Sequence, residues 1–179
     1  MEKYTVTDNL KHNKHVFEEI FSDCSDIKMV TMQLGQDGQL ACMVAYIEIA
    51  MSASNYGNSQ IGKLLGTLSG CSRETVAGFL LENGRGMTDV QMYRDLEDAA
   101  AGLLTGSLIL FVDGVDRVFK ISDRGYPGMG VQETASEKVT RGSNEGFSDS
   151  VKMNTALIRK RLRATELKNV EATAGRRTS

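Results

Sequence analysis

The sequence predicts an α+β sandwich: an α/β domain whose mixed or antiparallel sheet is covered by helices, followed by the start of a second α/β subdomain. Three observations lead to this prediction. Segments with helical apolar spacing alternate with segments typical of strands. The only proline, Pro127, lies in a glycine-rich stretch typical of a connector. Charge changes near that stretch, because residues 1–137 hold eleven basic and nineteen acidic side chains, whereas residues 138–179 hold ten and four.

A helix and a hairpin are expected first. Residues 9–21 place apolar side chains at roughly helical spacing and therefore predict a helix. Residues 27–34 and 39–48 are typical of strands. Their link at 35–38, Gly-Gln-Asp-Gly, contains an Asp-Gly step, which is a hairpin signal. We therefore expect the two strands to pair with each other.

Two short helices are expected next, at residues 58–68 and 72–82. The sequence Asn-Gly-Arg-Gly at 83–86 is expected to end the second helix, because Asn and Gly accept the left-handed conformation at a helix end. Both helices lie between the expected hairpin and the later strands, so they are expected to cover the sheet.

A longer helix and a strand pair complete the first part. Thr88 fits the N-cap position of a helix that runs to about Leu104. Residues 107–113 and 117–122 are typical of strands on either side of Gly114. The resulting order of helices and strands is what predicts an α+β or α/β sandwich.

We divide the chain into a first α/β subdomain at 1–124, a Gly/Pro connector at 125–136 and the incomplete start of a second subdomain at 137–179. The elements expected in the last range are a strand at 137–141, a turn at 142–146, a helix at 147–163 and a strand at 167–173. The glycines of the connector would supply a hinge between the two subdomains.

The expected helix at 147–163 has two contrasting faces. At 100° per residue its apolar side chains form one stripe, with Asn154 in the middle and Arg161 at the edge. The stripe consists of Phe147, Val151, Ile158 and Leu162. The opposite face is basic and consists of Lys152, Arg159, Lys160 and Arg163. One helix and one or two strands cannot bury the stripe alone, so we expect the second subdomain to be incomplete.

Composition and motifs exclude several classes of protein. The apolar runs are far shorter than the roughly 20 residues of a membrane helix, and the polar N-terminus does not resemble a signal peptide. Cys24, Cys42 and Cys71 form no CxxC pair, so no zinc site or disulfide framework is expected. No catalytic constellation or phosphate loop is present, so we expect a non-enzyme without cofactor or metal. Nucleic-acid binding is not expected, because Tyr126 and Phe147 are the only aromatic residues in the basic part.

Four segments resemble a known family. Residues 141–147 (Arg-Gly-Ser-Asn-Glu-Gly-Phe) and 154–162 (Asn-Thr-Ala-Leu-Ile-Arg-Lys-Arg-Leu) resemble the signature of the spore germination protein GerA family. That family comprises the A subunits of germinant receptors and stage V sporulation protein AF. Residues 103–114 resemble the family's L-x-G-x-x-x-L-F-[IV]-D-G segment, and Ser25-Asp26 resembles its early S-D-[IV] region.

Three positions depart from the family pattern. Met129 stands where the family often has an arginine, and Thr134 follows Glu133 where a Glu-Pro pair is common. Lys160 replaces one arginine of a triple and therefore lacks the planar fork that grips a carboxylate with two hydrogen bonds. Both alternatives stay open: the chain resembles either a receptor A subunit or stage V sporulation protein AF more closely.

The resemblance implies a function, partners and a location. Family members have a soluble N-terminal region of two α/β subdomains, followed by a membrane-embedded region in the spore inner membrane. This chain would be the soluble N-terminal region of a germinant receptor A-type subunit on the cytoplasmic, core side, sensing or relaying a small-nutrient signal for germination. Its implied partners are the receptor B and C subunits, a small nutrient ligand, and the membrane through a downstream region.

Two groups of side chains are the candidate site residues. Ligand or inter-subdomain contacts are expected from Arg124, Tyr126, Arg141, Asn154 and Arg161. Contacts with a partner or a membrane surface are expected from Lys152, Arg159, Lys160 and Arg163. Each has a structural alternative: Asn154 bonds a loop backbone, Arg141 and Arg161 pair with Glu133, Glu137 or Glu145, and the basic face is merely solvated. The alternative functions are a free-standing small-molecule binding module and a subunit-docking scaffold with no ligand.

Overall fold

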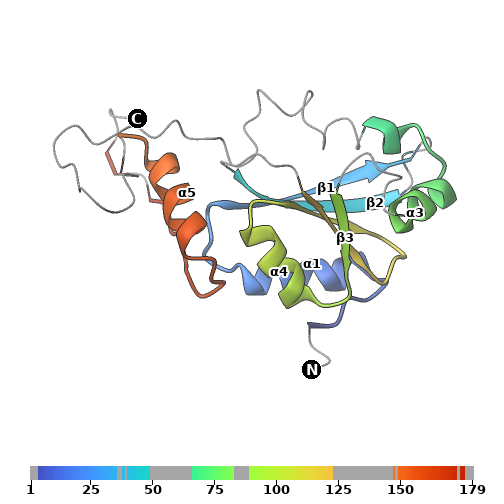
Figure 1. The fold of residues 1–179 in the computed structure, drawn as a ribbon, viewed down its shortest axis with the longest axis horizontal. Coiled ribbons are helices and arrows are strands. Elements are labelled where there is room, and N and C mark those ends of the chain that lie inside the picture. Colours follow the sequence, from blue (N-terminus) through green and yellow to red (C-terminus); the bar gives the residue numbers. More distant parts are fainter. Residues whose placement is uncertain are drawn as a thin grey trace.

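Five strands form one sheet in the order β1-β2-β4-β5-β3, and every neighbouring pair is antiparallel (Figure 1). The strands are β1 (Ile27–Leu34), β2 (Leu40–Ile47), β3 (Asp89–Tyr93), β4 (Leu108–Val112) and β5 (Val118–Ser122). The computed structural model describes residues 4–35, 38, 40–48, 66–82, 89–122, 147, 149–172 and 174–175. The expected connector at 125–136, strand at 137–141 and turn at 142–146 lie outside these residues, as do Thr88, residues 58–65 and residues 83–86.

The hairpin expected at the Asp-Gly step is confirmed. Strands β1 and β2 pair from Ile27 opposite Ile47 to Leu34 opposite Leu40. At the turn Gly38 donates its backbone N–H to the Gly35 carbonyl at 2.9 Å. Both glycines have positive φ angles, 87° and 58°, a conformation that side chains with a Cβ rarely adopt. The turn chemistry therefore fixes the register of the hairpin.

Helices cover both faces of the sheet. Helices α1 (Leu10–Ile20) and α4 (Leu96–Leu104) lie on one face (Figure 1). Helix α3 (Arg73–Leu81) lies on the other. Side-chain oxygens of Asn9 and Ser72 cap α1 and α3 by accepting backbone N–H groups. This arrangement confirms the predicted α+β sandwich, with a sheet that is antiparallel in the described residues.

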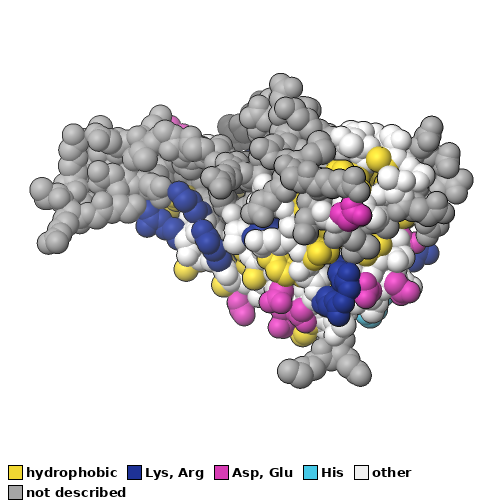
Figure 2. All heavy atoms as spheres, turned by 45° about the vertical axis from the view of Figure 1, so that its right-hand side comes forward, with side chains coloured by type: hydrophobic (Ala, Val, Ile, Leu, Met, Phe, Trp, Pro, Cys, Tyr) yellow, Lys and Arg dark blue, Asp and Glu magenta, His cyan; other side chains and the backbone are white. Residues whose placement is uncertain are grey.

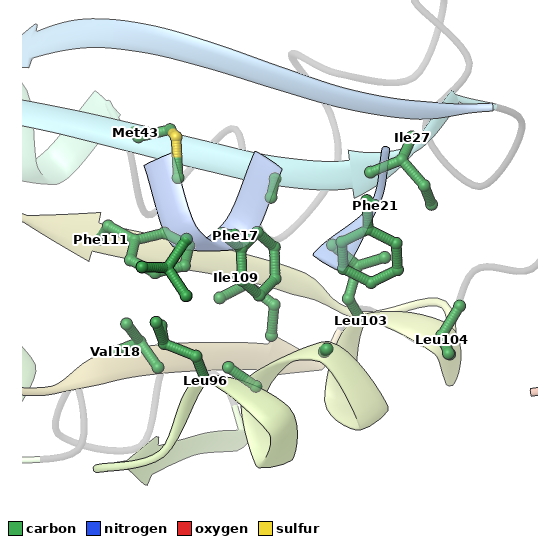
Figure 3. Packing of buried hydrophobic residues seen from close by; sticks show 14 of the residues in the cluster. Phe17, Phe21, Ile27, Met43, Leu96, Leu103, Leu104, Ile109, Phe111 and Val118 are labelled. Carbon is green, nitrogen blue, oxygen red and sulfur yellow. The ribbon is translucent and has the colours of Figure 1, made fainter. Parts of the chain in front are cut away.

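Alternating side chains of the central strands fill two hydrophobic clusters. On the α1 and α4 face, Phe17 of α1 stacks edge-on against Phe21 and Phe111, with ring centroids 5.1 and 5.0 Å apart (Figure 3). On the α3 face, Leu110 and Phe119 pack with residues of α3. Among the described residues, both clusters end before residue 122. We call residues 4–122, as far as they are described, the sheet unit.

The expected helix from Thr88 to Leu104 is wrong in its first half. Residues Asp89–Tyr93 form edge strand β3, which pairs with β5. The helix begins at Leu96, because the Asp95 carboxylate caps it by accepting the N–H groups of Glu97 and Asp98 at 2.8 and 3.3 Å. The alternation of Val90 and Met92 with polar residues was the strand signal, and pairing with β5 prevailed over the capping pattern at Thr88.

The last helix, α5 (Val151–Arg161), is shorter than the 147–163 expected for it. It begins after Ser150, whose hydroxyl accepts the Met153 N–H at 3.4 Å. The strand expected at 167–173 is reduced in the described residues to one parallel bridge between Cys24 and Asn169. Helix α5 lies at one end of the molecule, beside the loop that leads from α1 into β1 (Figure 1). We call residues 150–171 the arm.

Candidate functional site at helix α5

A buried ion pair joins the arm to the sheet unit. Arg159 of α5 donates from Nε and Nη2 to the two carboxylate oxygens of Asp26, both at 2.9 Å. Asp26 immediately precedes β1, so the pair spans 133 residues of sequence. Arg159 is 1% exposed and Asp26 5%. A two-pronged contact of this kind requires the planar guanidinium, which lysine lacks.

Arg159 also organises the chain that follows α5. Its Nη1 donates to the backbone carbonyls of Ala164 and Leu167 at 3.3 and 3.0 Å. Burial is the largest single influence and opposes the charged form, but the interactions with Asp26 and Cys24 together outweigh it, so the pKa of Arg159 is raised above its ordinary value. The guanidinium therefore stays charged and holds three backbone segments together.

Further polar contacts surround the ion pair. The Cys24 thiol donates to the Leu167 carbonyl at 3.6 Å. Ser25 donates its N–H to the Asn169 carbonyl at 2.8 Å and accepts the Glu171 N–H on its hydroxyl at 3.2 Å. The Asn169 Nδ2 group is buried and has no hydrogen-bond partner among the described residues. These contacts all fall on Cys24 and Ser25, the two residues just before Asp26.

A second, exposed ion pair lies beside the first. Lys152 of α5 donates to Glu48, just after β2, at 3.0 Å, and Lys28 of β1 lies 3.6 Å from the same carboxylate. The hydrogen bond from Lys152 is the main cause that lowers the pKa of Glu48, and burial opposes it. The same bond raises the pKa of Lys152.

One hollow between the described residues of the arm and the sheet unit is too small for a metabolite. A hollow of about 10 Å³ is lined by Asp26, Ile47, Glu48, Lys152, Thr155, Ala156 and Glu171. A cavity of roughly 10–15 Å³ holds about one water molecule. This junction therefore has the chemistry of a structural coupling between two segments.

The apolar stripe of α5 faces away from the sheet unit. Side chains that dock the helix, Lys152 and Arg159, come from one side, whereas Val151 on the other side is 70% exposed. Phe147, Leu157, Ile158, Arg161 and Leu162 line an open depression of about 490 Å³ on the outer side. Figure 2 shows basic and apolar side chains next to one another at this end of the molecule. Most of the stripe is thus exposed, and the incompleteness of the second subdomain stays a prediction.

The predicted ligand residues separate into two groups. Arg124, Tyr126 and Arg141 lie outside the described residues. Asn154 is half-buried on α5, and Arg161 is exposed at the edge of the outer depression. Glu133, Glu137 and Glu145, the proposed partners of Arg141 and Arg161, also lie outside the described residues. Their role in a ligand site or a locked connector stays a prediction.

The predicted basic surface needs one correction. Arg159 was expected on the exposed face, but it is buried on Asp26, because Asp26 and two carbonyls occupy its donors. Lys152, Lys160 and Arg163 are exposed, and Lys152 is already paired with Glu48. Arg163 donates from Nε to the Lys160 carbonyl at 3.3 Å. A contact of these exposed side chains with a partner or a membrane surface stays a prediction.

Asp26 is the site residue that sequence reasoning did not assign. Its signal was present, because Ser25-Asp26 and residues 154–162 both resemble family segments. The resemblance of each segment did not reveal that they touch. Another matching residue, Asp113, accepts the Leu10 N–H at 3.2 Å at the start of α1, and Gly114 donates to the Asp8 carbonyl at 2.8 Å. The matching segments thus stabilise contacts distant in sequence.

Metal and nucleophile chemistry find little support in the described residues. They contain no group of three or more His, Cys, Asp or Glu side chains that could hold a metal ion. His15 pairs with Glu19 on the exposed side of α1, at 3.5 Å. Burial, with the charge of Asp113, raises the pKa of the Cys42 thiol to about 12, so this thiol is unreactive near neutral pH.

Comparison with known proteins identifies relatives by sequence. The family model described as Bacillus/Clostridium GerA spore germination protein matches residues 15–179. The chain is 27% identical to the uncharacterized membrane protein YfkQ of Bacillus subtilis over 97% of its own length and 33% of that protein. It is 32% identical to stage V sporulation protein AF of the same species over 55% of its length and 20% of that protein. It is 26% identical to spore germination protein B1 of that species over 97% of its length and 35% of that protein.

A solved structure shares the fold. The N-terminal domain of the A subunit of the Bacillus megaterium spore germinant receptor GerK3 aligns with a TM-score of 0.65 at 20% identity, covering 90% of this chain and 58% of that one. The chain spans about a third of the length of YfkQ and of protein B1. In the described residues no helix combines the length and apolar character needed to cross a membrane. On the match over residues 15–179, the chain belongs to the GerA spore germination protein family.

Proposed function

We propose that this chain acts as the N-terminal region of a germinant receptor A-type subunit and relays a nutrient signal for spore germination. Its partners in this role are the B and C subunits, and its place is on the core side of the spore inner membrane, which a downstream region of the protein spans. It catalyses no reaction in this role.

Membership of the GerA family is the observation that carries the proposal. Two relatives are named for sporulation or germination, and the shared fold belongs to the N-terminal domain of a receptor A subunit. Relay is favoured over direct sensing at the described junction. The hollow between the arm and the sheet unit has room for about one water molecule, whereas an amino acid or a nucleoside needs a far larger site.

The Asp26–Arg159 pair supports relay in mechanical terms. A bidentate, buried contact fixes the direction as well as the distance between α5 and the start of β1. A displacement of α5 is therefore transmitted to β1 and, through the antiparallel ladder, to β2. Signal transfer by rigid-body movement of packed elements is an established mode of switching.

A deletion in the native host tests the proposed function. Spores that lack the gene, and spores in which the gene is restored, are exposed to amino acids, sugars and nucleosides in turn, and released dipicolinate is measured by terbium fluorescence. We expect release in response to at least one nutrient to be lost and then restored. Mechanically opened spores serve as the control, because their total dipicolinate should be unchanged.

Unchanged nutrient responses across the whole set would overturn the proposal. Ligand-observed NMR on the chain, screened with the same nutrients, separates relay from sensing. Relay predicts no binding to the chain itself, whereas saturable binding of one nutrient would favour the free-standing binding module. Loss of germination combined with failure to assemble with the other receptor subunits would favour the docking scaffold.

A further inference from the structure

The contacts that hold the arm differ in kind from those that hold the sheet unit. Among the described residues, neither hydrophobic cluster includes a residue of the arm. The arm's buried apolar residues in α5 are Ala156 and Leu157, and Ala156 lies with Ile47 at the edge of the small hollow. Ion pairs and hydrogen bonds also join the arm to the sheet unit.

These polar contacts converge on a short stretch of the sheet unit. Lys168 donates to the Ile20 carbonyl at 2.9 Å at the end of α1, and Leu167 and Asn169 meet Cys24 and Ser25. Arg159 meets Asp26 at the end of the same stretch. In the described part of the chain these polar contacts fall on residues 20–26 and on Glu48 beside them, so they can be released without opening the strand ladder.

Arg159 has two tasks at once. Two of its nitrogens grip Asp26, and the third holds the carbonyls of Ala164 and Leu167 within the arm. Loss of the planar guanidinium therefore weakens two sets of contacts. One is the pair with Asp26, and the other is the hydrogen bonds to the Ala164 and Leu167 carbonyls. The stripe residues Phe147, Val151 and Leu162 are mostly exposed, so they add little to the docking.

We propose that residues 150–171 undock from the sheet unit as one cooperative arm while the sheet stays folded, and that the Asp26–Arg159 pair is the latch of this motion. Local opening of a weakly attached segment, well below the free energy of global unfolding, is common in proteins. The latch goes beyond the proposed function, and the isolated 179-residue chain tests it whether or not the relay role holds.

The three cysteines allow undocking of the arm to be told apart from global unfolding, because they differ in burial. Cys71 is partly exposed, Cys24 is 8% exposed beneath the arm, and Cys42 is fully buried in β2. Thiol labelling is followed by peptide mass spectrometry on the wild type and on Arg159→Lys, which keeps the charge but loses the fork. When reclosing is fast, each labelling rate reports the population of the open form that exposes that thiol.

The latch predicts a selective effect. In Arg159→Lys we expect Cys24 to label about tenfold faster or more, with Cys42 unchanged, because only the arm opens more often. In Lys152→Ala, the matched variant at the exposed pair, we expect the Cys24 rate to change by less than about twofold. Hydrogen exchange should agree: the Ser25 and Glu171 amides exchange faster in Arg159→Lys, and the β2 and β4 amides do not.

Two results would overturn the proposal. Equal acceleration at Cys24 and Cys42 would mean that the substitution only lowers global stability. No acceleration at Cys24 would mean that the pair is not a latch. If Arg159→Lys does not fold, two other measurements test the proposal. One is labelling of Lys168→Ala, which removes only the bond to the Ile20 carbonyl. The other is hydrogen exchange of the wild type. A wild-type arm whose amides exchange as slowly as those of β2 has no separate motion.

Discussion

The sheet unit and the arm are held by different forces. In the sheet unit, alternating side chains of β2, β4 and β5 fill two apolar clusters under α1, α4 and α3. The arm is joined to that unit mainly by ion pairs and hydrogen bonds, and it turns the apolar stripe of α5 outward. The same chain thus contains one region stabilised by burial and one positioned by directional contacts.

This difference determines how each region should respond to change. Apolar burial is non-directional and shared among many neighbours, so damage to it lowers the stability of the whole unit. A buried ion pair is worth little net stability when intact, yet removing one partner leaves an uncompensated charge. Damage to the latch should therefore be large but local. Four predictions test this contrast, from the largest effect to the smallest.

Phe17→Ala should have the largest global effect. Phe17 is fully buried between Phe21 and Phe111, and truncating such a ring costs about 3–5 kcal/mol. Urea unfolding should show this loss, and Cys42 should become accessible together with Cys24. The control Val30→Ala, at an exposed position of β1, should leave the urea midpoint nearly unchanged. A loss seen only in the arm would break the comparison.

Asp26→Asn should have a comparable effect that stays in the arm. It leaves the buried guanidinium of Arg159 without its charge partner, which costs about 3–5 kcal/mol in typical buried pairs. We expect faster hydrogen exchange at the Ser25 and Glu171 amides and only a small fall in the urea midpoint of the chain. Asp23→Asn is the matched control, because Asp23 is exposed and Asn accepts its positive φ of 59°. If the free energy of unfolding in urea fell by the whole cost of the unpaired charge, the arm would belong to the global folding unit.

Asp95→Ala should cost about 1 kcal/mol, because it removes the carboxylate that caps α4. Thermal unfolding of the chain measures the loss, and it should be global, since α4 packs on the main cluster. Asp98→Ala, in the first turn of the same helix, should cost less, since it removes only a charge near the helix dipole. Equal losses would argue that Asp95 is not the cap.

Lys152→Ala should have the smallest effect, visible mainly as a change in pH dependence. In the wild type the pKa of Glu48 lies below its ordinary value of 4.5, so the stabilisation from its ionised form is present above that pH and is lost as pH falls through the lowered pKa. Hydrogen exchange of the arm amides, measured between about pH 3 and pH 6, should depend less on pH in Lys152→Ala than in the wild type. Lys14→Ala, at an exposed pair within α1, should leave the arm's acid sensitivity intact.

Local signals in the sequence were sufficient for most of the fold. The Asp-Gly step marked the hairpin, and apolar spacing marked α1 and the strand pair around Gly114. Residues 89–93 were misassigned, because a five-residue edge strand has too short an alternation to compete with a good capping pattern. Its assignment as a strand depends on β5, a partner about 30 residues away.

The sequence by itself determined the fold class, the hairpin and the family, because turn chemistry, periodicity and a long signature are local properties of the chain. Only the tertiary structure decided the role of Arg159. On a helical wheel it belongs to a basic face, yet Asp26 lies 133 residues earlier and draws it inward. Helical periodicity tells which residues share a side of a helix. Which residues are buried depends on what that helix meets, and here a carboxylate and two carbonyls bury Arg159, whereas Lys152, Lys160 and Arg163 stay exposed.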